Sequence, residues 1–146
     1  MKKMVDVTVQ YAVARKGLPS AHSVRRWTAS SLGRTAAVTI RFVGAREARL
    51  LNKRYRGKDY ATNVLSFPYE SERLSGDLVL CAPVIAREAR EQGKAVRDHY
   101  AHLIVHGLLH LQGWDHEHSA AAQKMEKREI AILASLGVSD PYVISA

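Results

Sequence analysis

The sequence contains one cysteine, Cys81, in 146 residues. A single thiol excludes an intrachain disulfide and a metal cluster held by several thiolates. It fits a reducing compartment, so we expect a cytoplasmic protein. The chain also lacks an apolar run of about 18 residues, the length that a membrane-spanning helix needs, and the polar residues near its start argue against a signal peptide. We therefore expect no association with a membrane.

Signs of a domain boundary are also missing. No internal repeat, low-complexity tract or linker rich in proline or serine divides the chain. Its length is that of one ordinary domain, and its 47% hydrophobic and 25% charged residues are usual for a globular protein. We expect a single domain over residues 1–146.

Acidic residues are scarce in the first part of the chain. Residues 1–60 contain 14 lysines and arginines but 3 acids, whereas residues 61–146 contain 8 basic and 11 acidic residues. The balance is thus +11 in the first part and −3 in the second, for a total of +8. Basic surfaces attract phosphate backbones, which favours a nucleic-acid partner. A charge that only keeps a small protein soluble is the alternative.

Strand and helix patterns succeed one another along the chain. Strands are expected at 5–10, 36–44, 62–70 and 76–82, with Pro68 ending the third or placing it at a sheet edge. Helices are expected at 20–33, 45–55, 82–93 and 96–111, and from a cap at Ser119 to residue 136. Strands dominate the first half, which predicts an α+β fold: a small mixed sheet of about four strands with about five helices.

Three histidines, His102, His106 and His110, are spaced four residues apart in the segment 96–111. The rest of this segment is largely apolar, as in a buried central helix. The spacing places the imidazoles on one stripe of that helix. Because buried polar groups need partners, and one metal ion can serve two imidazoles a turn apart, the stripe predicts a metal site.

A third ligand must come from outside this helix. Gly113 is a natural helix terminator, since glycine readily adopts positive φ and lets the chain turn back. His116, three residues further on, can then reach the same ion. We predict His106, His110 and His116 as the metal ligands.

The other histidines of this region receive lesser roles. His102 could replace His116 as a ligand, but it lies two turns from His110, which favours a supporting or core role. His99 and His118 lie at or beyond the ends of the motif, and we interpret them as ordinary polar residues.

Three neutral nitrogen ligands suit a catalytic ion better than a structural one. They leave a divalent ion with its full charge and an open coordination position. Imidazoles without thiolates favour Zn²⁺, with Ni²⁺, Cu²⁺ and Fe²⁺ as alternatives. One Zn²⁺ that acidifies a water molecule makes hydrolysis the expected chemistry.

Gly107 helps to distinguish which kind of bond is hydrolysed, a peptide bond or a phosphodiester bond. The series His106, His110, Gly113, His116 has the spacing of the metzincin protease motif H-E-x-x-H-x-x-G-x-x-H, but Gly107 replaces its general-base glutamate. Peptide hydrolysis needs that base. Phosphodiester cleavage depends more on neutralising charge at the phosphate, a task for a metal and arginine. A metzincin-like metalloprotease remains an alternative.

Two stretches resemble the YbeY family of bacterial metal-dependent endoribonucleases: HGLLHLQGWDH at 106–116 and YRGKDYATNVLSFPYE at 55–70. The similarity includes GDLVL at 76–80 and DPY at 140–142. It implies cleavage of single-stranded RNA in ribosomal RNA maturation, above all at the 3′ end of the small-subunit RNA, and in ribosome quality control. The implied partners are ribosomal RNA, the small ribosomal subunit and assembly factors.

The resemblance also implies roles for individual residues. His106, His110 and His116 match the zinc ligands of the family, and Arg56 matches an arginine important for activity. A guanidinium is a permanently charged fork that suits phosphate oxygens. Asn63 stands where many members have aspartate, which removes one candidate base.

Further candidates are weaker. Asp77 on the fourth strand is a candidate for a residue that faces the same cleft, and Tyr55 and Tyr60 are candidates for stacking on bases. A non-catalytic RNA-binding or ribosome-assembly factor with a structural zinc is the remaining alternative to the nuclease.

Overall fold

Four strands pair into one mixed sheet in the order β1, β2, β4, β3. The structure is a computed structural model that describes residues 4–114 and 117–143. β1, β2 and β4 are parallel, and β3 runs antiparallel to β4 at the edge. Pro68 lies in β3, where an edge strand tolerates the missing N–H, as predicted. The strands are β1 (Val5–Tyr11), β2 (Ala36–Val43), β3 (Val64–Tyr69) and β4 (Leu74–Cys81).

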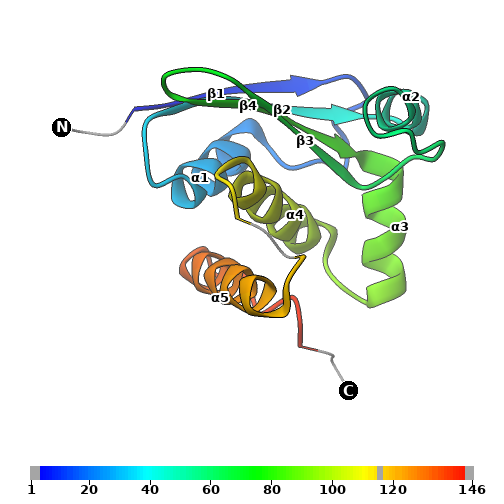
Figure 1. The fold of residues 1–146 in the computed structure, drawn as a ribbon. Helices are drawn as coiled ribbons and strands as arrows, with labels where there is room; N and C mark the ends of the chain where they lie inside the picture. Colours follow the sequence, from blue (N-terminus) through cyan, green and yellow to red (C-terminus); the bar gives the residue numbers. More distant parts are fainter. Residues whose placement is uncertain (1–3, 115–116, 144–146) are drawn as a thin grey trace.

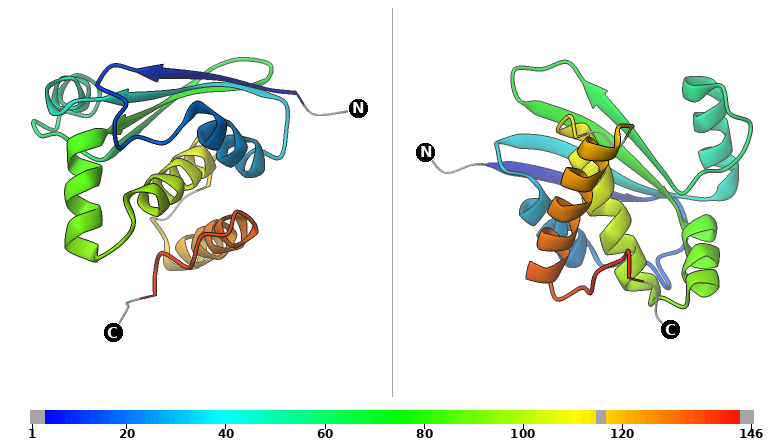
Figure 2. Two further views of the ribbon diagram at one scale, coloured as in Figure 1. Left: turned by 180° about the vertical axis from the view of Figure 1, so that it is seen from behind. Right: turned by 60° about the horizontal axis from the view of Figure 1, so that its bottom comes forward.

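Five helices accompany the sheet in the described residues, and the fold is α+β as predicted. α1 and α4 cover one face of the sheet, and α5 packs on α4 from the side away from the sheet (Figures 1 and 2). α2 and α3 lie at one end of the sheet. None of these helices is long and apolar enough to cross a bilayer. The helices are α1 (Ala21–Ser31), α2 (Ala45–Arg56), α3 (Ala82–Gln92), α4 (Val96–Leu111) and α5 (Ser119–Ser135).

α4 is enclosed between the sheet and α5. Ile104, Val105 and Leu108 are fully buried and join the main hydrophobic core, together with Ile40 and Leu78 of the sheet. Burial of a large aliphatic side chain contributes about 1.5–3 kcal/mol. The helix that carries the histidine stripe is therefore held firmly in place.

Some helices are followed by a glycine that ends them, and some predicted helix bounds differ from the structure. Gly93 and Gly113 have φ of 63° and 92°, as expected for residues that end helices. The expected end of the first helix at residue 33 is wrong by two residues, because α1 ends at Ser31 and Gly33 has no positive φ. The predicted cap at Ser119 is wrong by one residue, since His118 holds the cap position.

Gly107 lies where α4 approaches the sheet closely. A Cβ added at this position would stand 2.3 Å from Cδ1 of Leu78 in β4. The hydroxyl of Ser66 in β3 donates a hydrogen bond to the Gly107 carbonyl oxygen over 3.3 Å. A side chain at position 107 would thus point into the sheet, and packing itself requires glycine here.

Substituting Gly107→Ala should destabilise the protein by up to about 2 kcal/mol. Alanine gains about 1 kcal/mol of helix propensity over glycine, but overpacking against Leu78 costs about 1–3 kcal/mol. Urea unfolding measures the difference. Gly33→Ala is the control, because nothing lies within 4 Å of a Cβ there. A Gly107→Ala protein as stable as the wild type would contradict the packing argument.

Candidate metal centre and its cleft

His106 and His110 of α4 direct one nitrogen each to a common position. Their Nε2 atoms are 3.1 Å apart, and their ring centroids are 4.6 Å apart. Two imidazole nitrogens bound about 2.0–2.1 Å from one tetrahedral Zn²⁺ would stand about 3.3–3.4 Å apart. The spacing and the nitrogen donors of this pair therefore fit a shared metal ion.

The third predicted ligand, His116, lies outside the described residues. The chain before it turns back as expected: Gly113 has φ of 92°, and the Trp114 amide donates a hydrogen bond to the Leu109 carbonyl oxygen over 3.1 Å. His116 stays a prediction as a ligand.

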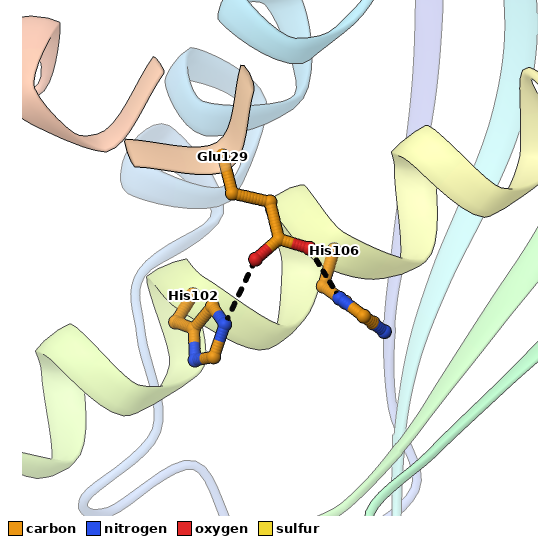
Figure 3. Close-up of side chains that lie close together, drawn as sticks. All are labelled: His102, His106 and Glu129. Atoms are coloured by element: carbon orange, nitrogen blue, oxygen red, sulfur yellow. Dashed lines mark hydrogen bonds and ion pairs between the residues drawn. The ribbon is translucent and has the colours of Figure 1, made fainter. Parts of the chain in front are cut away.

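A buried carboxylate from α5 meets the histidine stripe. Glu129 is 0% exposed, and its two oxygens accept hydrogen bonds from Nε2 of His102, at 3.2 Å, and from Nδ1 of His106 (Figure 3). The Tyr142 hydroxyl donates to the same carboxylate. Burial acts to raise the pKa of Glu129, but the three hydrogen bonds outweigh it and lower the pKa to about 2. The carboxylate is therefore ionised at neutral pH.

His102, His106 and Glu129 form a group that could itself hold a metal ion, since one ligand atom from each lies within 4.8 Å of the others. In this structure, however, the Glu129 oxygens already accept hydrogen bonds from those two nitrogens. An ion between them would have to displace both bonds. An ion between the Nε2 atoms of His106 and His110 would replace the one hydrogen bond between these two rings and leave the Glu129 contacts intact. His102 contacts the same carboxylate as His106, and its supporting role stays a prediction.

Glu129 was not predicted from the sequence. A signal was available: along α5, Glu129 interrupts a stripe of otherwise apolar buried residues that includes Met125, Ile132 and Leu133. A carboxylate on the buried face of an amphipathic helix requires a partner, which is reason to search for one.

A cavity of about 440 Å³ joins Arg56 to His106 and His110. Asn63, which directly precedes β3, and Ser66 within β3 line the same cavity. The structure therefore brings together Arg56 and two of the predicted ligands, from α2 and α4. Their chemical roles stay predictions.

The position of Arg56 follows from how α2 ends. Arg56 is the last residue of α2, and Gly57, with φ of 69°, ends the helix. The buried Asn52 amide donates a hydrogen bond to the Tyr60 carbonyl oxygen over 2.9 Å and fixes the following loop. The Tyr55 ring contacts the Phe67 ring edge-on at 5.2 Å, which ties the end of α2 to β3.

His99 is not the ordinary polar residue that the sequence analysis expected. It is 4% exposed, and its Nε2 lies 3.0 Å from a Glu88 carboxylate oxygen. The Asn63 amide donates to the same carboxylate over 3.1 Å. An aspartate at position 63 would face this carboxylate as a like charge, so asparagine suits its partner here.

Asp77 does not face the cleft. Its neighbours Gly76 and Leu78 point towards α4, and side chains alternate along a strand, so Asp77 lies on the other face of the sheet. There it accepts a hydrogen bond from the Tyr69 hydroxyl. Tyr55 and Tyr60, the candidates for base stacking, are 60% and 51% exposed.

Comparison with known proteins finds close relatives over nearly the whole chain. A sequence model of the family described as Endoribonuclease YbeY matches residues 13–137. A Stenotrophomonas maltophilia (strain K279a) protein named Endoribonuclease YbeY is 57% identical over 150 aligned residues, covering 94% of this chain and 93% of that protein. A protein of the same name from Aromatoleum aromaticum is 56% identical over 140 residues, covering 93% and 91%.

A solved structure also resembles this fold. A Thermotoga maritima protein determined in solution matches with a TM-score of 0.59 over 96% of this chain and 99% of that chain. The two sequences are 24% identical, so this likeness concerns the fold alone.

Replacing His110 with alanine should weaken Zn²⁺ binding by at least about 100-fold, because one of two converging nitrogens is lost. Competition with a chelator of known affinity measures the change. His22→Ala, an exposed histidine on α1, is the matched control and should bind Zn²⁺ as the wild type does. Equal affinity of the His110→Ala and wild-type proteins would place the ion elsewhere.

The protein should become less stable as the pH falls, and His99 should cause part of this loss. Burial lowers the pKa of His99 below its usual 6.5, and the Glu88 contact only partly opposes this. The folded protein therefore resists protonation at His99. The resulting stability is complete above about pH 6.5 and is lost as the pH falls from there through the folded-state pKa, with a slope of at most about 1.4 kcal/mol per pH unit.

Urea unfolding between pH 5 and 8 tests this dependence in wild type, His99→Gln and His22→Gln. We expect His99→Gln to flatten the pH dependence and the exposed His22→Gln to leave it unchanged. If His99→Gln retains the full wild-type slope, another group causes it.

Proposed function

The chain belongs to the YbeY family, and we propose that it is an endoribonuclease that cleaves single-stranded RNA with one bound Zn²⁺. The observation that carries the proposal is the cavity in which Arg56 lies with His106 and His110. A permanently charged guanidinium beside a pair of metal-binding imidazoles suits an anionic phosphodiester.

Zn²⁺ is proposed because the site offers imidazole nitrogens and no thiolate among the described residues. His106 and His110 would hold it, with His116 as the predicted third ligand. When bound, Zn²⁺ would supply Lewis acidity and positive charge next to the scissile phosphate.

Arg56 would bind a non-bridging phosphate oxygen and stabilise the negative charge that grows there during cleavage. Asn63 and Ser66 line the same cavity, with their side chains hydrogen-bonded to Glu88 and to the Gly107 carbonyl oxygen. The attacking oxygen is either water or the 2′-hydroxyl of the RNA. Analysis of the product ends separates them, because internal attack leaves a 2′,3′-cyclic phosphate.

A basic helix adjoins the cavity and would bind the RNA backbone. The exposed surface of α2 includes Arg46, Arg49, Lys53 and Arg54, and Arg56 ends the same helix. Cations along a backbone track give affinity that falls steeply with salt. Tyr55 and Tyr60, both exposed near Arg56, would stack on unpaired bases and favour single strands.

The proposed biological setting is ribosomal RNA maturation at the 3′ end of the small-subunit RNA and ribosome quality control in the cytoplasm. The partners would then be ribosomal RNA, the small subunit and its assembly factors. Membership in the YbeY family and the exposed cations of α2 support this setting.

A metalloprotease is disfavoured by the packing of α4. The general base of metzincins would occupy position 107, where a side chain would run into Leu78. A non-catalytic assembly factor differs from the nuclease in one observable: it would bind RNA without cutting it.

Substituting Arg56→Ala should lower kcat for single-stranded RNA by about 100-fold or more and leave Zn²⁺ affinity unchanged, because the guanidinium acts on the phosphate. Arg54→Ala removes the same charge two residues earlier on α2. It should mainly weaken RNA binding and leave kcat close to that of the wild type. Single-turnover cleavage of a labelled RNA measures both effects.

Chelation of the metal should abolish the same cleavage, and added Zn²⁺ should restore it. Cleavage that survives both chelation and His110→Ala in nuclease-free preparations would contradict the proposed function. RNA binding with no cleavage under any metal would favour the assembly factor.

A further inference from the structure

The contacts around Glu129 extend the metal site beyond its ligands. We infer that Glu129 is a positioning residue, which orients His106 for metal binding from α5, and that Tyr142 of the C-terminal segment holds Glu129 in place. The inference rests on the metal site of the proposed function, and it concerns how that site is built.

The first step is the tautomer of His106. Nδ1 of His106 lies at hydrogen-bonding distance from a Glu129 oxygen, and a carboxylate accepts hydrogen bonds, so the tautomer with its proton on Nδ1 is the one that makes this contact. In a neutral imidazole, Nε2 then keeps its lone pair. That Nε2 is the atom 3.1 Å from Nε2 of His110, at the common position where an ion fits. Glu129 thus selects the tautomer and the ring orientation that metal binding needs.

The second step is that Glu129 is better suited to orient a ligand than to be one. Its side chain is 0% exposed, and His102, His106 and Tyr142 all donate to its two oxygens. Direct ligation would break these bonds inside the protein, where lost hydrogen bonds are costly. The arrangement is that of a carboxylate supporting a metal-binding histidine.

The third step links the C-terminal segment to the site. Tyr142 follows α5, and its hydroxyl reaches back to Glu129. Two contacts fix the turn that presents it: the Tyr142 amide donates to Asp140 Oδ1 over 2.8 Å, and Lys94 Nζ donates to the Pro141 carbonyl oxygen over 2.9 Å. Docking of residues 140–142 therefore supports the orientation of His106 through Glu129.

The affinity test uses the full chain with Glu129→Gln, Tyr142→Phe and the control Glu126→Gln. Glu126 lies on the same helix but is exposed. Chelator competition should show Zn²⁺ affinity reduced about 10- to 100-fold in Glu129→Gln. The reduction should be about tenfold or less in Tyr142→Phe, which removes one of three donors. Glu126→Gln should bind as the wild type does.

Two spectroscopic readouts separate positioning from a merely structural role. In metal-free protein, ¹⁵N NMR should show the wild-type His106 protonated at Nδ1, and Glu129→Gln should shift the population towards the other tautomer. At saturating Co²⁺, the absorption spectrum of Glu129→Gln should match that of the wild type, because no ligand is lost. Thermal unfolding checks that each variant is folded.

Unchanged affinity together with an unchanged His106 tautomer in folded Glu129→Gln would overturn the inference. An altered Co²⁺ spectrum at saturation would also overturn it, because Glu129 would then be a ligand. If the wild type binds no metal, the proposed function fails, and the tautomer measurement still decides whether Glu129 orients His106.

Discussion

The ionised carboxylate of Glu129 lies inside the protein and could not remain there without partners, because desolvating a lone charge is prohibitively costly. Its donors come from two segments: two histidines of α4 and Tyr142 near the C-terminus. This requirement fixes α5 against α4 and constrains the His106 ring. The contacts that make the buried charge tolerable also aim Nε2 of His106 at Nε2 of His110.

The opposite side of α4 imposes a second constraint. Gly107 packs against Leu78 without room for a side chain, so this face of α4 lies directly against the sheet. The histidine stripe is left to face α5 and the cleft beside β3. Arg56 reaches this cleft because the end of α2 is tied to β3 through Tyr55 and Phe67. An imidazole pair and the Arg56 guanidinium thus line one cavity, and Arg56 ends the basic helix α2.

Features set by local sequence could be predicted, and those set by distant packing could not. The bounds of α4, the edge position of β3 and the positive φ of Gly113 follow from periodicity, proline and glycine. Glu129 escaped prediction because its partners lie 23 and 27 residues away. His99 was misread because its burial depends on α3. Asp77 was assigned to the wrong face of the sheet. The face that a side chain occupies depends on strand register, and a shift of one residue exchanges the two faces.

A titration of metal-free protein with Zn²⁺, with RNA cleavage and metal binding followed in parallel, tests whether this site performs the chemistry. Cleavage of single-stranded RNA should rise with metal occupancy, share its midpoint and saturate at one Zn²⁺ per chain. Cleavage by metal-free protein, or activity that follows a second, weaker binding event, would contradict the account.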